Sequence, residues 1–215
     1  MKLKKIASLA LAGIMAVSML TACGEGTGNS GENGNGEEVT PSANYTATVL
    51  EETSDVTQAK LSASSSTKLD KAVAFAANNY TIASAAVSQN LTMIPNGWNQ
   101  VTAVKNIMLG ASYAANDMDG WQFDPDNYKE NTYWIMYHVS RAMTDEYITE
   151  QIADKLDNWA ASMVNDDEIV NNATWDYTVS VAKADCLAGN EPDRAKDSVI
   201  VGIAVTLTKT DVKYN

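Results

Sequence analysis

The chain has 215 residues, of which fifteen are basic and twenty-seven acidic, and its formal net charge is −12. This acidity disfavours nucleic acid and anionic lipid headgroups as partners, because both carry negative charge themselves. The single histidine, His138, excludes zinc sites that need two or three imidazole ligands.

The first twenty-three residues have the composition of an export signal. Lys2, Lys4 and Lys5 precede residues 6–20, which are uncharged and too few to span a bilayer comfortably. Cys23 then directly follows Leu-Thr-Ala, a pattern that resembles the lipobox of bacterial lipoproteins. The resemblance, which covers residues 1–23 only, implies removal of signal peptide 1–22 and lipidation of the Cys23 thiol. Acyl chains such as palmitate would then anchor the protein to a membrane, facing outside the cytoplasm.

The segment 23–44 is expected to form the lipidated cysteine and a flexible tether. It is rich in Gly, Asn, Ser and Glu and has almost no apolar side chain before Val39, so it cannot build a core. A flexible chain of this length spans roughly 25 Å. Gly24 occupies the place of the aspartate that commonly retains lipoproteins in an inner membrane, which favours a Gram-positive cell surface.

Residues 45–215 have the length of one domain, without a second low-complexity stretch or an internal repeat. Removing the three signal lysines leaves twelve basic residues against twenty-seven acidic ones, a net charge of −15. Lipidation of Cys23 leaves Cys186 as the other cysteine, so no internal disulfide is expected. The domain must therefore be stabilised by its apolar core.

Hydrophobic periodicity predicts the first elements of this domain. Residues 45–50 alternate as a short strand does. Thr67 and Asp70 have capping-box spacing, and apolar residues three and four apart predict a helix over about 68–90. A second helix is predicted over about 99–116, where an asparagine can cap it.

The second half of the domain has clearer patterns. Residues 132–139 alternate and are rich in aromatic side chains, which predicts a strand. Thr144, followed by two acidic residues and an apolar stripe, predicts the start of a long helix. Residues 175–181 and 199–207 predict two antiparallel strands. The expected fold is therefore α+β, a single domain with an antiparallel sheet and helices packed on one face.

Two arrangements are candidates for catalysis. Cys186 as a nucleophile with His138 as its base would make the chain an envelope hydrolase. Acidic pairs such as Asp124 with Asp126, or the acidic run at 166–168, would suit glycoside hydrolysis if the fold brought two of them face to face. The simpler interpretation is an inert thiol, an imidazole on a sheet face and solvated acidic loops, so an enzyme is not the favoured hypothesis.

The segment 115–126 resembles a degraded calcium loop of the EF-hand or dockerin type. Asp117, Asp119 and Asp126 fall at the third, fifth and twelfth ligand positions. The first position is an alanine, however, and the twelfth lacks the usual bidentate glutamate. Calcium is therefore a weak hypothesis beside an ordinary turn.

Two tryptophans, Trp98 and Trp121, stand directly after turn dipeptides, where an exposed ring can stack on a sugar or instead close the end of the core. The favoured function is a non-catalytic surface lipoprotein that binds a cell-wall glycan, a peptide or an envelope protein. The alternatives are the envelope hydrolase and a weak calcium or glycan binder. The ligand itself does not follow from the sequence.

Overall fold

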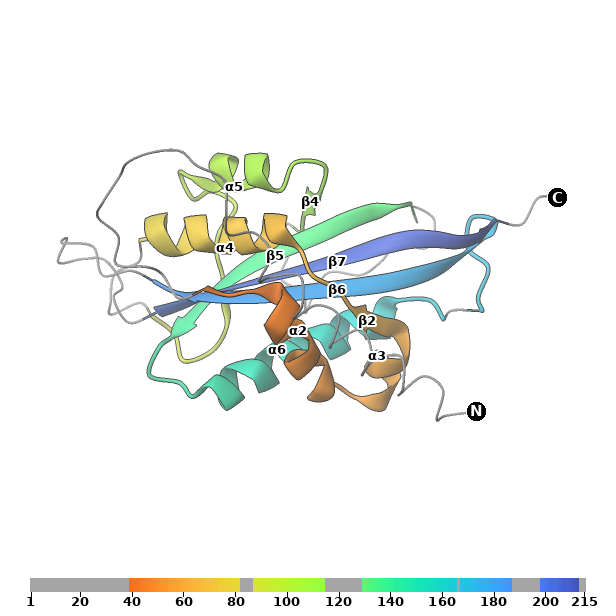
Figure 1. Ribbon diagram of the computed structural model, residues 1–215, viewed down its shortest axis with the longest axis horizontal. Helices are drawn as coiled ribbons and strands as arrows, with labels where there is room; N and C mark the ends of the chain where they lie inside the picture. The colour runs from red at the N-terminus through yellow and green to blue at the C-terminus, as the bar shows by residue number, and fades with distance from the viewer. Residues whose placement is uncertain (1–38, 82–86, 115–128, 166, 187–197, 213–215) are drawn as a thin grey trace, which may run out of the picture.

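Three long antiparallel strands form the centre of the fold in the computed structural model (Figure 1). β7 lies between the other two strands and pairs with both along most of its length. The strands are β5 (Asn131–Ser140), β6 (Ala173–Asp185) and β7 (Ser198–Val212). The three strands expected from alternation are confirmed, as is the antiparallel pairing of the last two. The structure describes residues 39–81, 87–114, 129–165, 167–186 and 198–212. For residues 211 and 212 it describes the backbone alone.

Short strands extend this sheet on both sides. β1 pairs antiparallel and β2 parallel with β6, while β3 pairs antiparallel and β4 parallel with β5. Their bounds are Val39–Thr40, Leu61–Ala63, Thr92–Met93 and Ser112–Tyr113. The described residues thus form one seven-stranded, mostly antiparallel sheet. Five strands follow the order β1-β6-β7-β5-β3, while β2 also pairs with β6 and β4 with β5. The expected α+β class is confirmed.

Helices cover both faces of the sheet, where the sequence had suggested one (Figure 1). On one face lie α2 (Ser42–Glu51) and α6 (Asp145–Ser162), with α3 (Asp55–Lys60) beside α6. On the other lie α4 (Thr67–Asn79) and α5 (Val101–Ile107). The reason is visible in β7, whose central residues are apolar at successive positions: Val201 and Ile203 join the core under α6, and Ile200 and Ala204 the core under α4.

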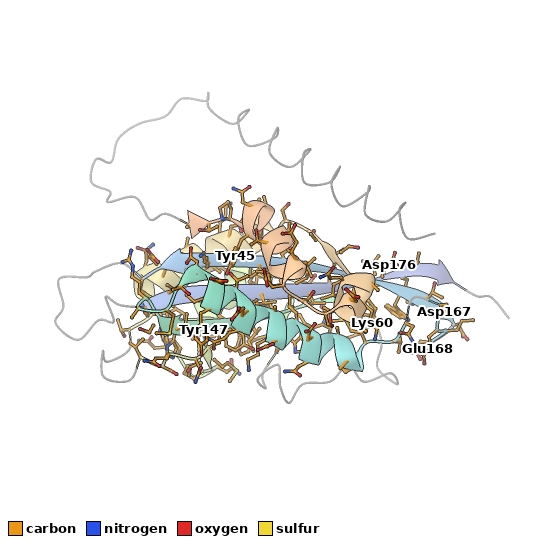
Figure 2. All side chains as sticks on the ribbon, turned by 90° about the horizontal axis from the view of Figure 1, so that it is seen from below. Tyr45, Lys60, Tyr147, Asp167, Glu168 and Asp176 are labelled. Carbon is orange, nitrogen blue, oxygen red and sulfur yellow. The ribbon has the colours of Figure 1, made fainter. Side chains whose placement is uncertain are left out.

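The ends of α6 show how the sequence fixes this helix. The Thr144 hydroxyl accepts a hydrogen bond from the Tyr147 N–H at 3.2 Å, so the predicted N-cap is confirmed. At the other end the Lys60 ammonium donates to the carbonyls of Ala160 and Met163 at 2.9 and 2.7 Å. Lys60 (labelled in Figure 2) thereby places a positive charge at the negative end of the helix dipole.

The N-terminal part of the fold differs from expectation. The residues expected to form a strand, 45–50, lie inside α2, because Tyr45 and Val49 are one helical turn apart and bury on the same face. The structure also places residues 39–44, expected in the tether, in β1 and α2, where Ser42 is fully buried. Residues 24–38 of the expected tether lie outside the described residues.

Two predicted helices are shorter than their apolar patterns suggested. α4 ends at Asn79 because Tyr80 adopts an extended conformation; of the remaining predicted stretch, residues 82–86 lie outside the described residues and 87–90 are not helical. α5 ends at Ile107, and Gly110 with a φ of 91° turns the chain into β4. In the part of the chain that is described, no helix is both long and apolar enough to cross a membrane.

Candidate functional site

The sheet face beneath α4 changes from apolar to hydroxyl-bearing along its length. The register places four rows across β6, β7 and β5: Ala184, Ile200 and His138; Ala182, Gly202 and Met136; Ser180, Ala204 and Trp134; Thr178, Thr206 and Thr132. Leu69 and Val73 of α4 pack onto the second row, at Gly202. Since α4 begins at Thr67, the helix leaves part of the last two rows without cover.

A pocket of about 230 Å³ lies over this end of the sheet, and we call it the hydroxyl pocket. The sheet contributes Thr132, Ser180, Ala204 and Thr206 to its lining. The loop before α4, the first turn of α4 and the segment after α5 contribute Ser64, Ser65, Ser66, Lys68, Met108, Leu109, Gly110 and Ala111. Six of these twelve residues carry a hydroxyl, one is a lysine and none is acidic. In a chain with an excess of acidic residues, this lining is a local exception.

The first turn of α4 is held by a short network of hydrogen bonds at one wall of the pocket. The Ser66 hydroxyl accepts from the Leu69 N–H at 3.2 Å, while the Ser66 N–H donates to the Ser42 hydroxyl at 2.8 Å. The Asp70 carboxylate accepts from the Ser42 N–H at 2.8 Å. The turn's acidic residue is therefore engaged with α2, and it does not line the pocket.

Donors at the start of α4 are available, and of its first two residues Lys68 belongs to the lining while Thr67 does not. No group in the described part of the chain accepts from the backbone N–H of Thr67 or Lys68, the first two residues of the helix. The Lys68 ammonium donates to the Leu109 carbonyl at 2.9 Å, which uses one of its three N–H bonds. A ligand in the pocket would thus meet a lysine ammonium and the positive end of a thirteen-residue helix.

The Ser180 hydroxyl is the most deeply placed polar group of the lining. Ser180 is 5% exposed and has no side-chain hydrogen bond to any described residue. The neighbouring hydroxyls of Thr132 and Thr206 differ, because they share a hydrogen bond of 2.8 Å. The Ser180 hydroxyl is therefore free to hydrogen-bond to a molecule in the pocket.

The catalytic candidates Cys186 and His138 lie elsewhere, at the opposite end of the same sheet face. Cys186 is 4% exposed and His138 is 2% exposed, and β7 separates their strands. The centre of the Tyr80 ring lies 5.5 Å from that of the His138 ring. The pKa of Tyr80 is raised by burial and, to a smaller extent, by the charge of Cys186. Both candidates therefore belong to a buried cluster around Tyr80, in which a substrate would not reach a nucleophile.

The environment of His138 also opposes a role as a base that takes up protons. Burial lowers the pKa of its imidazole below the ordinary value of 6.5, because the charged form would lose its hydration. Its Nδ1 atom is buried and has no hydrogen-bond partner among the described residues. The imidazole is therefore a neutral core side chain.

The other sequence candidates do not meet at a site. Trp98 is half-buried and packs edge-on against Tyr80, with ring centroids 5.3 Å apart, at the margin of the core under α4. Asp167 and Glu168 are exposed at one end of the molecule (Figure 2). No group of three or more His, Cys, Asp or Glu side chains able to hold a metal occurs within the described ranges. The remaining candidates lie outside the described residues: Cys23, Asp117, Asp119, Trp121, Asp124, Asp126 and Asp166.

A second concavity, of about 400 Å³, lies between α2 and the start of α6. Four of its polar residues interact with one another. The Thr149 hydroxyl donates to the Asp145 carbonyl at 2.7 Å, so the Tyr45 hydroxyl must donate to Thr149, at 2.8 Å. The Lys183 ammonium pairs with the Asp145 carboxylate at 2.7 Å and lies 4.8 Å from the centre of the Tyr45 ring. Burial raises the pKa of Tyr45 to about 12, which keeps its hydroxyl protonated.

The hydroxyl pocket was not predicted from the sequence. The serines at 64–66 form the one local signal, because a run of hydroxyl residues precedes an apolar helix. The observed N-cap of α4 is Ser66, one residue before the predicted Thr67. Ser180 and Thr132 are far apart in the sequence and meet only through the strand register. The chain matches no protein-family model, no curated protein and no solved structure.

Proposed function

We propose that this chain is a lipid-anchored extracytoplasmic bacterial protein whose folded domain binds a small polar ligand and catalyses no reaction. The hydroxyl pocket supports this proposal most directly, since it lies beside the start of α4, where the backbone N–H groups of the first turn are unused. The described residues of its lining include no thiol, imidazole or carboxylate, the groups that act as nucleophile or base in such hydrolases. The burial of Cys186 and His138 supports the same interpretation.

The anchor is proposed from the sequence of residues 1–23. Lipid on Cys23 would hold the domain at the outer side of a membrane, with a Gram-positive surface favoured, and residues 24–38 would separate the domain from the lipid. The ligand would then come from the cell wall, from a neighbouring envelope protein or from the surrounding medium.

The anchor is tested by cell fractionation of the wild-type chain and the Cys23→Ala variant. Wild-type protein is expected in the membrane fraction after a high-salt wash, and the variant in the soluble fraction. Salt removes proteins that are held by charge alone, so the wash separates lipid anchoring from surface adsorption. A variant that stays with the washed membrane would overturn the proposed anchor.

The absence of catalysis is tested on purified cell wall, with a pull-down and a zymogram on the same material. We expect retention without clearing if the wall supplies the ligand, and no clearing in any case. Clearing by the wild-type chain that is lost in both Cys186→Ala and His138→Ala would replace the binding proposal with the hydrolase.

A further inference from the structure

We propose that the hydroxyl pocket binds an oxyanion, either the carboxylate or the phosphate of a small polar molecule. This inference rests on the proposed binding function and specifies its ligand class. Three independent features of the pocket support it: the sign of its charge, the unused donors of α4, and the unpaired hydroxyl of Ser180.

The charge of the lining selects against cations. Lys68 is the only charged residue in the described part of the lining, although acidic residues outnumber basic ones by twenty-seven to fifteen in the whole chain. The nearest acidic side chain of the helix start, Asp70, is held by the Ser42 N–H. A cation would therefore meet the Lys68 ammonium and the positive helix end without a compensating carboxylate, whereas an anion is favoured by both.

The backbone of α4 offers an oxyanion the donors that it needs. The N–H groups of Thr67 and Lys68 are unused among the described residues, and they belong to the first turn of a helix long enough to carry a dipole. Phosphate and carboxylate groups bind at such helix ends because several N–H groups converge there. The Lys68 ammonium adds a full positive charge at the same place.

Ser180 supplies the observation that does not depend on the helix. The residue is 5% exposed and lines the pocket, and its hydroxyl has no acceptor in the described part of the chain. An oxygen of the ligand would give this hydroxyl the partner that the protein lacks. Because the charged oxygens of an oxyanion accept hydrogen bonds, they match a wall that presents ammonium, amide and hydroxyl donors together.

The size of the pocket limits the ligand to a small molecule. A volume of about 230 Å³ lies below the usual range of drug-sized sites, ~300–1,000 Å³. Leu109, 72% exposed, belongs to the lining and offers an apolar surface to the rest of the ligand. The fitting ligands are thus short carboxylic acids and phosphorylated small molecules, and the experiment below distinguishes these two sources of the oxyanion.

The test is isothermal titration calorimetry on the full chain in detergent, at constant ionic strength set with chloride. The probes are inorganic phosphate, acetate and glucose, the last as a neutral polyol. We expect a saturable heat with phosphate or acetate and none with glucose. Saturation by phosphate alone assigns a phosphorylated ligand, and saturation by acetate alone assigns a carboxylic acid.

Three variants connect the binding to the pocket. Lys68→Gln removes the charge and should weaken binding by ~10-fold or more, the usual value of a charge-assisted hydrogen bond. Ser180→Ala should weaken binding ~3-fold or more without lowering the melting temperature of the unliganded protein, because the hydroxyl has no partner there. Lys71→Gln, on the exposed side of the same helix, is the matched control and should stay within about twofold.

The failure of this inference is distinguishable from the failure of the binding proposal. Saturable binding of glucose, with neither anion bound, would overturn the oxyanion and leave a binding domain. Anion binding that Lys68→Gln and Lys71→Gln weaken equally would overturn the pocket as its place. A chain that binds none of the three probes and no purified cell wall would overturn both.

Discussion

Val73 packs directly onto the backbone of Gly202: a Cβ atom added to Gly202 would lie 2.4 Å from the Val73 Cγ2 atom and 3.0 Å from the Leu69 Cδ1 atom. Both distances are shorter than carbon atoms tolerate without movement. The absence of a side chain at Gly202 therefore lets α4 lie close to the sheet at this position. The hydroxyl pocket depends on that position.

We predict that Gly202→Ala destabilises the fold by ~1–3 kcal/mol, the usual cost of overpacking a core. Chemical denaturation measures this change as a lower midpoint. Gly97→Ala is the matched control, because an added Cβ there would meet nothing within 4 Å. Equal midpoints for the two variants would show that α4 shifts at no cost.

Thr46 of α2 hydrogen-bonds to the edge of β6, between the positions that pair with β2 and those that pair with β1. β2 pairs with residues up to Val179 and β1 with Lys183 and Ala184, which leaves the Val181 N–H without a strand partner. The Thr46 hydroxyl accepts from this N–H at 2.9 Å and donates to the Ser42 carbonyl at 2.7 Å. A helix side chain thus replaces one rung of the β-ladder.

Thr46→Val should cost ~1–3 kcal/mol, because it keeps the shape of the side chain and leaves the Val181 N–H buried without an acceptor. The exposed Thr48 of the same helix provides the control, Thr48→Val. Thermal unfolding of the two variants checks the prediction. If Thr46→Val unfolds at the control's temperature, then water must satisfy the Val181 N–H.

The stability of the protein should depend on pH through His138. Burial lowers its folded pKa below 6.5, so at slightly acidic pH the unfolded chain binds a proton that the folded chain does not. The free energy of unfolding is therefore highest above the unfolded pKa. It falls as the pH drops from 6.5 toward the folded pKa. The total loss is ~1.4 kcal/mol for each unit by which the folded pKa lies below the unfolded one.

The measurement is urea unfolding between pH 5.5 and 7.5 on wild type and His138→Phe. Because His138 is the only histidine, the difference between the two slopes isolates its contribution from that of the carboxylates. We expect the variant to be less dependent on pH over this range. Parallel slopes would mean that the imidazole takes up its proton equally in both states.

The elements that sequence reasoning located correctly are those with strong local signals. Thr144 and the acidic turn after it begin α6, and the long alternation of β5 and β7 leaves one interpretation. The strand predicted over 45–50 is wrong because a stretch of six residues fits the periodicity of a strand and that of a helix alike. Burial of Tyr45 against Thr149 selects the helix. Local patterns thus sufficed for long elements only.

The helices on both sheet faces and the hydroxyl pocket depend on information that is not local. The pocket exists because Gly202 admits α4, because β-register aligns Ser180 with Ala204, and because the serines before α4 reach that row. None of these residues carries a motif. The residues with distinctive chemistry, such as Cys186, lie instead in a buried cluster.

The central claim, that the start of α4 receives an oxyanion, is tested most directly by following the backbone amide resonances of Thr67 and Lys68 by NMR. During titration of the full chain with phosphate or acetate at constant ionic strength, we predict saturable shifts at these two amides. The first turn of α6, which carries Asp145 and Glu146, should stay unchanged and serves as the internal control. Shifts of equal size at both helix starts, or none at Thr67 and Lys68, would contradict the account.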